Sequence, residues 1–196
     1  MPFFYHYEDA IEAHLRRAGA EVYLVDTNIH AHGFGKKLIL FYTKTLRDRL
    51  VFHYYQQALR TVPADLDEVM IIKGQWMTDE VLHFLQAQLP EADFRIYHWD
   101  SVATFPDQLR INRFFTKIYT FDPVDAKQYG WIYRPTFFEE DICHSSSDKQ
   151  YDFLMICSMH TRRMEVLQKL KAYAAAENRT VFSYIYVPKL QYIRET

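Results

Sequence analysis

The sequence predicts an α/β fold built on a doubly wound, parallel β-sheet. Strand-like and helix-like segments alternate along its 196 residues, which is the order that βαβ units produce. The run 68–74 is apolar without alternation, as expected for a strand buried on both faces. Hydrophobic residues make up 49% of the chain and charged residues 24%, so it can form a core without disulfides or a structural metal.

The first half of the chain is expected to hold two strands and three helices. Apolar residues at helical spacing predict helices over 7–18 and 36–60. Between them, 21–26 is rich in β-branched and aromatic residues and predicts a strand. The strand at 68–74 is followed by a helix over 79–89, which has a threonine N-cap and two acidic residues in its first turn.

The second half repeats this alternation and divides into two domains. Strands and helices are predicted, in chain order, at 93–100, 108–115, 117–122, 123–130, 151–158, 160–177 and 180–187. A polar stretch with three consecutive serines marks a linker at 141–150. We therefore expect one domain over 1–140 and, over 151–196, the first βαβ unit of a second domain that is incomplete.

Charge and composition exclude several classes of protein. The net charge of −2 provides no basic field for binding nucleic acid. No stretch approaches the roughly 20 apolar residues of a membrane span, and 1–6 lacks the basic start of a signal peptide. Cys143 and Cys157 are too few for a disulfide framework. We expect a soluble, cytoplasmic protein.

Polar residues follow three of the predicted strands, at the edge where open α/β sheets bind ligands: Lys73, Gly74, Asp100, Ser101 and Asp122. Asp100 is interpreted as a general base or a hydroxyl ligand, and the alternative is an N-cap. Lys73 would bring a cation to a phosphate or sugar oxygen, with Gly74 permitting close backbone approach. The alternative for this pair is a solvated lysine in a turn. Ser101 and Asp122 are predicted substrate ligands.

A second candidate site lies where the helix predicted at 160–177 begins. Free N–H groups at a helix start suit a diphosphate, and His160, Arg162 and Arg163 would reinforce them. The alternative is a capped helix start with surface arginines. His30 and His32 have two ligating rings but no third ligand at a recognisable spacing, so no metal is predicted.

The helix predicted at 36–60 carries six basic residues and one acidic residue. Such a helix could dock on an anionic membrane surface. It could also be a core helix with a charged outer face, and its apolar period favours this second interpretation.

Five motifs, in order, resemble a group of bacterial proteins. The run I-Y-H-W-D-S at 96–101 is similar to their Y-x-W-D-S segment, and 115–128 resembles their F-D-K-V-F-S-F-D-P-x-D-A-K-K. The run 129–135 continues with Y-G and R-P, 69–74 resembles V-x-V-I-K-G, and 151–163 resembles Y-D-x-x-F-I-G-x-x-H-x-x-R. These are glycosyltransferase-like proteins of the GT-B type, from capsular polysaccharide or lipopolysaccharide biosynthesis.

The resemblance implies two Rossmann-like domains that transfer a sugar from a nucleotide-sugar, without metal or other cofactor. Asp100 would deprotonate the glycan or lipid-linked acceptor, and Lys73 and Ser101 would line the acceptor side. His160 and Arg163 would lie near the donor diphosphate. By this resemblance we expect 1–140 to lack the family's usual first strand, which would leave a sheet edge unpaired. The alternative is therefore a non-catalytic α/β binding module or one that self-associates into a homo-oligomer.

Overall fold

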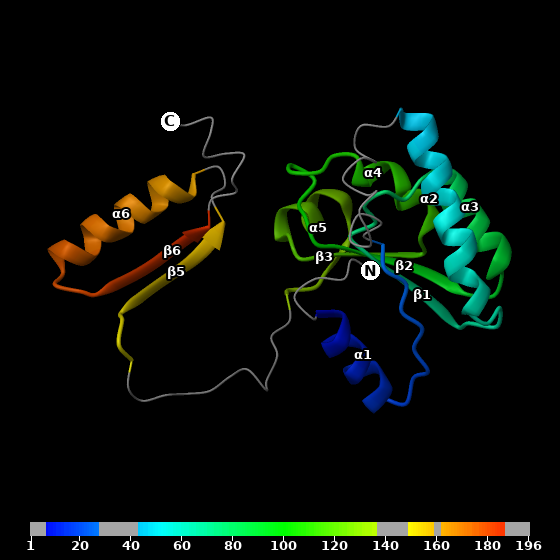
Figure 1. Cartoon of the computed structure of the whole chain (residues 1–196), viewed down its shortest axis with the longest axis horizontal. Coiled ribbons are helices and arrows are strands. Elements are labelled where there is room, and N and C mark those ends of the chain that lie inside the picture. The colour runs from blue at the N-terminus through cyan, green and yellow to red at the C-terminus, as the bar shows by residue number, and fades with distance from the viewer. Residues whose placement is uncertain (1–6, 28–42, 137–148, 159–161, 187–196) are drawn as a thin grey trace. The chain divides into compact units, whose positions relative to one another are not determined.

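The computed structural model describes residues 7–27, 43–136, 149–158 and 162–186 (Figure 1). The chain divides into two compact units, Met1–Glu139 and Glu140–Thr196. The sequence predicted a division between 140 and 141, with a linker at 141–150, of which 141–148 lie outside the described residues.

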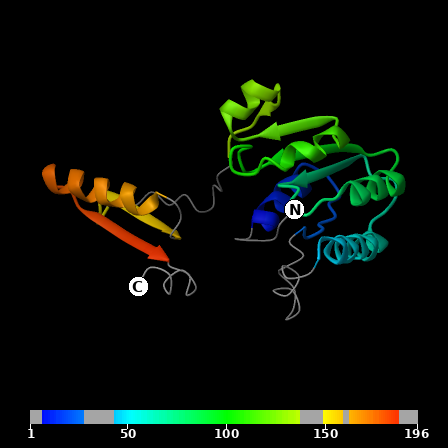
Figure 2. The ribbon, with the colours of Figure 1, turned by 90° about the horizontal axis from the view of Figure 1, so that it is seen from above.

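Unit 1 is an α/β domain with a four-stranded, all-parallel sheet in the order β1-β2-β3-β4 (Figures 1 and 2). Its elements are α1 (Tyr7–Arg17), α2 (Lys44–Ala58), the 3-10 turn η2 (Leu59–Thr61), β1 (Glu68–Ile72), α3 (Asp79–Gln88), β2 (Asp93–His98), α4 (Gln108–Ile111), η3 (Asn112–Phe114), β3 (Lys117–Thr120), α5 (Pro123–Tyr129) and β4 (Ile132–Tyr133). The α/β class and the parallel sheet are confirmed. The order follows the chain, so the described strands contain none of the reversal that a doubly wound sheet requires.

The predicted strand at 21–26 is wrong, because these residues form no ladder. Two of their carbonyl oxygens accept from side chains instead. Arg16 Nη2 donates to Val22 O at 2.8 Å, and the Tyr54 hydroxyl donates to Asp26 O at 2.6 Å. A β-rich pattern becomes a strand only where its backbone groups bond to those of a neighbouring strand.

The helix predicted at 36–60 is described only from Lys44 onward, since 28–42 lie outside the described residues. The Thr43 hydroxyl accepts from Leu46 N at 3.5 Å and caps α2. Val51 and Tyr55 are its buried residues, which agrees with the core interpretation. No helix among the described residues is long and apolar enough to cross a membrane.

The core lies on one face of the sheet, between β1 and β2 and the helices α2 to α4. Phe94, Ile96 and His98 alternate along β2 and are buried. The opposite face is less covered by the described residues, since Met70 in β1 is 42% exposed. The expectation that 68–74 is buried on both faces holds at Ile71 and Ile72, which point to opposite faces and are 4% and 5% exposed, and fails at Met70. Helix α1 lies on this opposite side in Figure 1, where Tyr7 meets Trp99 edge-on at 6.0 Å.

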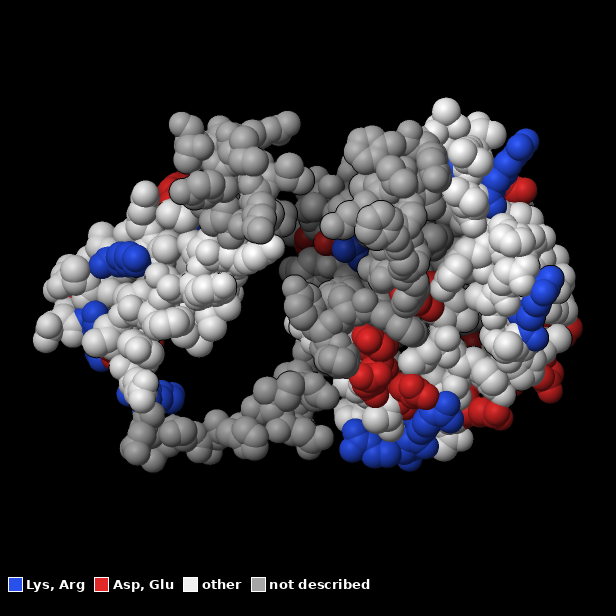
Figure 3. Space-filling model, viewed as in Figure 1, with Lys and Arg blue, Asp and Glu red and all other residues white. Residues whose placement is uncertain are grey.

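Charged side chains gather over α1 in Figure 3, acidic at its start and basic at its end. This arrangement suits the helix dipole, which favours carboxylates in the first turn and cations in the last. One ion pair within the helix, Arg16 Nε to Glu12 Oε1, measures 2.8 Å.

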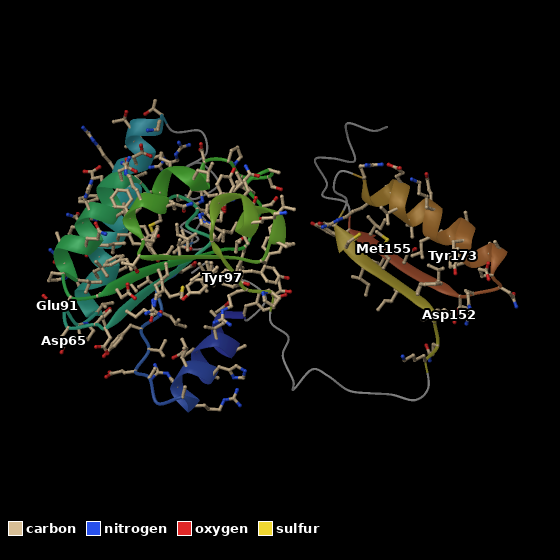
Figure 4. All side chains as sticks on the ribbon, turned by 180° about the vertical axis from the view of Figure 1, so that it is seen from behind. Asp65, Glu91, Tyr97, Asp152, Met155 and Tyr173 are labelled. Carbon is tan, nitrogen blue, oxygen red and sulfur yellow. The ribbon has the colours of Figure 1, made fainter. Side chains whose placement is uncertain are left out.

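The described residues of unit 2 form one βαβ unit made of β5 (Phe153–Ser158), α6 (Arg163–Ala176) and β6 (Val181–Tyr186). The strands are parallel and pair from Phe153–Val181 to Ser158–Tyr186. Helix α6 lies along one face of the pair, where Tyr173 meets Phe153 edge-on at 6.1 Å (Figure 4). Alternate side chains on the other face are exposed: Leu154, Ile156, Phe182, Tyr184 and Tyr186.

Candidate functional site

A cavity of about 740 Å³ opens at the carboxyl ends of β1 and β2. Because the two strands are parallel neighbours, the residues that follow them meet at one edge of the sheet. Lys73 and Gly74 come from the end of β1, and Asp100 and Phe105 come from the loop after β2. We call this space the Lys73–Asp100 cavity.

Lys73 and Asp100 form an ion pair across the cavity, with Lys73 Nζ 2.9 Å from Asp100 Oδ2. Their side chains are 26% and 28% exposed, so the pair is half-buried, and Asp100 Oδ2, the oxygen beside Lys73, is itself buried. The Lys73 backbone N–H donates to Tyr97 O at 2.9 Å. This bond extends the ladder one residue beyond β1 and fixes the backbone position from which the Lys73 side chain extends. Lys73 and Asp100 are 27 positions apart in the sequence, and they meet because each follows the carboxyl end of one of two neighbouring parallel strands.

The loop after β1 has an unusual backbone. Lys73 and Trp76 both have positive φ, 68° and 70°, although neither is glycine. Such conformations cost about 1–2 kcal/mol each for a residue with a Cβ. Both side chains line the cavity, so the strained loop presents a cation and an indole ring to the same space.

Aromatic faces in the cavity are covered by cations. The Arg47 guanidinium carbon lies 5.3 Å from the centroid of the Trp76 ring, and Lys73 Nζ lies 5.6 Å from that of Phe105. Both distances are within the range of cation–π attraction. The cavity therefore offers flat apolar surfaces beside charged groups, as small-ligand sites do.

The wall formed by the start of α3 is held by arginines. Arg110 Nη2 donates to Met77 O at 2.8 Å, and Arg110 also pairs with Asp79. Arg113 Nη2 lies 2.6 Å from the same carboxylate. Of the other cations that line the described cavity, Lys44 pairs with Asp48 at 3.3 Å and Lys73 with Asp100, and Arg47 lies over the Trp76 ring.

Gly74 serves packing. Its φ is 58°, and a Cβ placed there would lie 2.8 Å from Ile111 Cδ1 and 3.0 Å from Ile96 Cδ1. The space left by the missing side chain is therefore filled by the core. Close approach of a ligand to the backbone, for which Gly74 was predicted, stays a prediction.

Two other predicted substrate ligands lie outside the described lining of this cavity. The Ser101 hydroxyl is 3.0 Å from Thr104 Oγ1 within the turn after β2. Asp122 caps α5, where Oδ1 accepts from Val124 N at 2.8 Å. These positions correspond to capping and turn roles.

In the second unit, the predicted donor-side arginines have partners within the unit. Arg162 binds Glu165 through two nitrogens at 2.9 and 3.0 Å, and these bonds lower the pKa of the Glu165 carboxyl. Arg163 Nη1 donates to Ser158 O at 2.9 Å. His160 lies outside the described residues, as do His30 and His32.

Sequence reasoning missed Arg47 and Trp76, which come from α2 and the loop after β1. It also missed Asp125, a buried residue whose Oδ2 accepts from Val102 N at 2.8 Å and holds the loop that carries Asp100. One signal was present: a helix that precedes a parallel strand begins at the strand's carboxyl end, so the first turn of α2 belongs at this edge.

His98 is a buried group next to this site. Its Nε2 is 2.8 Å from Asn112 Oδ1, its ring lies 5.0 Å from that of Trp131, and its Nδ1 has no partner among the described residues. Burial lowers the pKa of His98, so the ring is held neutral.

The chain matches no known protein family, no curated protein and no solved structure. Within the described part of the chain, no group of three or more His, Cys, Asp or Glu side chains could hold a metal ion.

Proposed function

We propose that this protein takes part in transferring a sugar from a nucleotide-sugar, and that the Lys73–Asp100 cavity binds the hydroxylated acceptor. The observation that carries the proposal is the half-buried Lys73–Asp100 pair at the carboxyl edge of the sheet. Trp76 and Phe105 in the same cavity support it, since flat aromatic rings provide apolar contact for the C–H faces of a sugar.

In this proposal Asp100 is the general base. Its carboxylate takes the proton of an acceptor hydroxyl, whose oxygen attacks the anomeric carbon of the donor sugar. The bond from that carbon to the phosphate oxygen breaks, and the nucleoside diphosphate leaves with the electron pair. Lys73 then offsets charge beside the base and donates to the acceptor's oxygens.

The donor would be held by the second domain, with Arg162, Arg163 and His160 near its diphosphate. A glycan or a lipid-linked acceptor fits the same chemistry. A cytoplasmic location, with contact at the inner membrane face through 36–60, belongs to this proposal. The Rossmann-like architecture of the GT-B type is also part of this proposal.

The test measures release of nucleoside diphosphate from a panel of nucleotide-sugars, with and without oligosaccharide acceptors. We expect acceptor-dependent release from the unmodified protein and a loss of at least about 100-fold in Asp100→Asn, as for other general bases. The matched control is Asp107→Asn, which changes another carboxylate of the cavity lining and should keep the activity. Full activity in Asp100→Asn, or no release from any donor, would overturn the proposal.

A further inference from the structure

A second cavity, of about 570 Å³, lies along the outer edge of β1. Helix α1 and the segment 19–25 line one side, and β1 with the turn before it lines the other. Of the described lining residues, only Met77 also lines the Lys73–Asp100 cavity. We call this second space the β1-edge groove.

The edge of β1 that faces this groove carries backbone groups without ladder partners among the described residues. Lys73 N bonds to Tyr97 O, and Asp93 N bonds to Asp67 O, so the odd-numbered residues pair with β2. Groups of successive residues point to opposite sides of a strand. Met70 and Ile72 therefore point their N–H and C=O groups away from β2, toward the groove.

One buried hydroxyl also lines the groove. Tyr55 is 2% exposed, and its hydroxyl has no hydrogen-bond partner among the described residues. Leaving a buried hydroxyl unpaired costs about 1–3 kcal/mol, so the position favours a ligand that brings an acceptor. A peptide carbonyl is such an acceptor.

The groove is apolar along its length and acidic at one end. Apolar side chains from several elements line it: Ile11, Leu59, Leu66, Leu85 and Leu89. Glu21, Asp65, Asp67 and Glu68 are exposed and line it near the start of β1. Only Glu68 among these has an ion pair in the described chain, with Arg95 at 2.5 Å. The surplus negative charge favours a basic group on the occupant.

We propose that the β1-edge groove binds an extended peptide from another polypeptide, which adds as a strand beside β1. The peptide runs parallel to β1, places apolar side chains on the groove's lining, and sets a lysine or arginine near its amino end against Asp65 and Asp67. Backbone groups that repeat every second residue along β1 select an extended chain over a lipid or a compact small molecule, because only a strand repeats at that spacing.

The probe is a fluorescein-labelled peptide, Lys-Leu-Thr-Val-Thr-Leu, added to the full chain. We expect saturable binding by fluorescence anisotropy and slower hydrogen exchange of the Met70 and Ile72 amides. A peptide N-methylated at the alternate residues whose N–H groups would face β1 loses the donors that this pairing needs and should bind at least tenfold more weakly. A peptide with Glu in place of Lys should weaken similarly.

Variants of the protein locate the site. Asp65→Lys should weaken the peptide about tenfold, and Tyr55→Phe should weaken it severalfold by removing the hydroxyl. Glu91→Lys is the matched control, since this exposed residue precedes the neighbouring strand β2, at the same end of unit 1 as Asp65 in Figure 4, and is not among the residues that line the groove. It should leave the affinity unchanged.

Three results would overturn the proposal: no binding at millimolar peptide, equal binding of the N-methylated peptide, or equal effects of Asp65→Lys and Glu91→Lys. Concentration-dependent dimerisation that protects Met70 and Ile72 without added peptide would also contradict it, because the occupant would then be a second copy. None of these results bears on sugar transfer at the Lys73–Asp100 cavity.

Discussion

Replacing Gly74 by alanine tests how the loop after β1 is held. The new Cβ would lie 2.8 Å from Ile111 Cδ1 and 3.0 Å from Ile96 Cδ1, both belonging to residues at most 2% exposed. Those methyls are enclosed and cannot move aside freely, so overpacking should cost about 1–3 kcal/mol. The φ of 58° adds about 1–2 kcal/mol for a residue with a side chain. We expect the free energy of unfolding of unit 1 to fall by about 2–5 kcal/mol.

The matched control is Gly130→Ala. Gly130 has a similar φ of 70°, but no atom lies within 4 Å of its Cβ position, so only the backbone cost remains. Urea unfolding followed by tryptophan fluorescence is suitable, because all three tryptophans, Trp76, Trp99 and Trp131, belong to unit 1. With a slope of about 2 kcal/mol per molar urea, the two midpoints should differ by roughly 0.5–1.5 M. Equal midpoints would refute the packing argument.

Three further changes test other parts of the chain. Burial lowers the pKa of His98, so the neutral ring of the folded protein is stabilising above pH 6.5, the unfolded value, and this stability is lost as the pH falls toward the folded value. The urea midpoint should therefore drop between pH 7.5 and 5.5. The drop should be smaller in His98→Gln, and the control is His83→Gln, at an exposed histidine. Asp125→Ala leaves the buried Val102 N–H without an acceptor and should lower the free energy of unfolding by about 1.5–3 kcal/mol, measured by urea titration. Ile156→Lys, at a side chain 65% exposed, should reduce binding of the dye ANS while changing the free energy of unfolding by no more than about 0.5 kcal/mol.

The sheet was predictable where one stretch of sequence specifies one element. The apolar run at 68–74 and the capped helix after it correspond to β1 and α3, and Asp122 and Gly130 bound α5. The strand predicted at 21–26 is absent, and two of its carbonyl groups bond instead to Arg16 and Tyr54, which lie on other elements. A local sequence pattern does not show which side chains of other elements will bond to its carbonyl groups.

The candidate site was predictable to the extent that it depends on topology. Lys73 and Asp100 were expected to meet because they follow neighbouring strands. Arg47 over Trp76 could not be foreseen, because that contact joins a helix to a loop 29 positions away and depends on the positive φ of Trp76. Side-chain contacts of this kind follow from packing, which the order of elements does not specify.

The Lys73 backbone bears on whether its pairing with Asp100 serves stability. A positive φ costs this residue about 1–2 kcal/mol, whereas a half-exposed ion pair contributes about 0–1 kcal/mol. The ion pair therefore does not offset the free-energy cost of the positive φ of Lys73. A strained residue whose conformation stability does not explain points to function. Lys73→Gly removes both the strain and the pair and adds about 0.5–1 kcal/mol of unfolded-chain entropy, so stability should stay within about 1 kcal/mol of the unmodified protein while oligosaccharide binding is lost. Lys73→Met, which keeps the strain, should be the less stable of the two in urea. A loss of 3 kcal/mol or more in Lys73→Gly would show instead that the pair holds the fold.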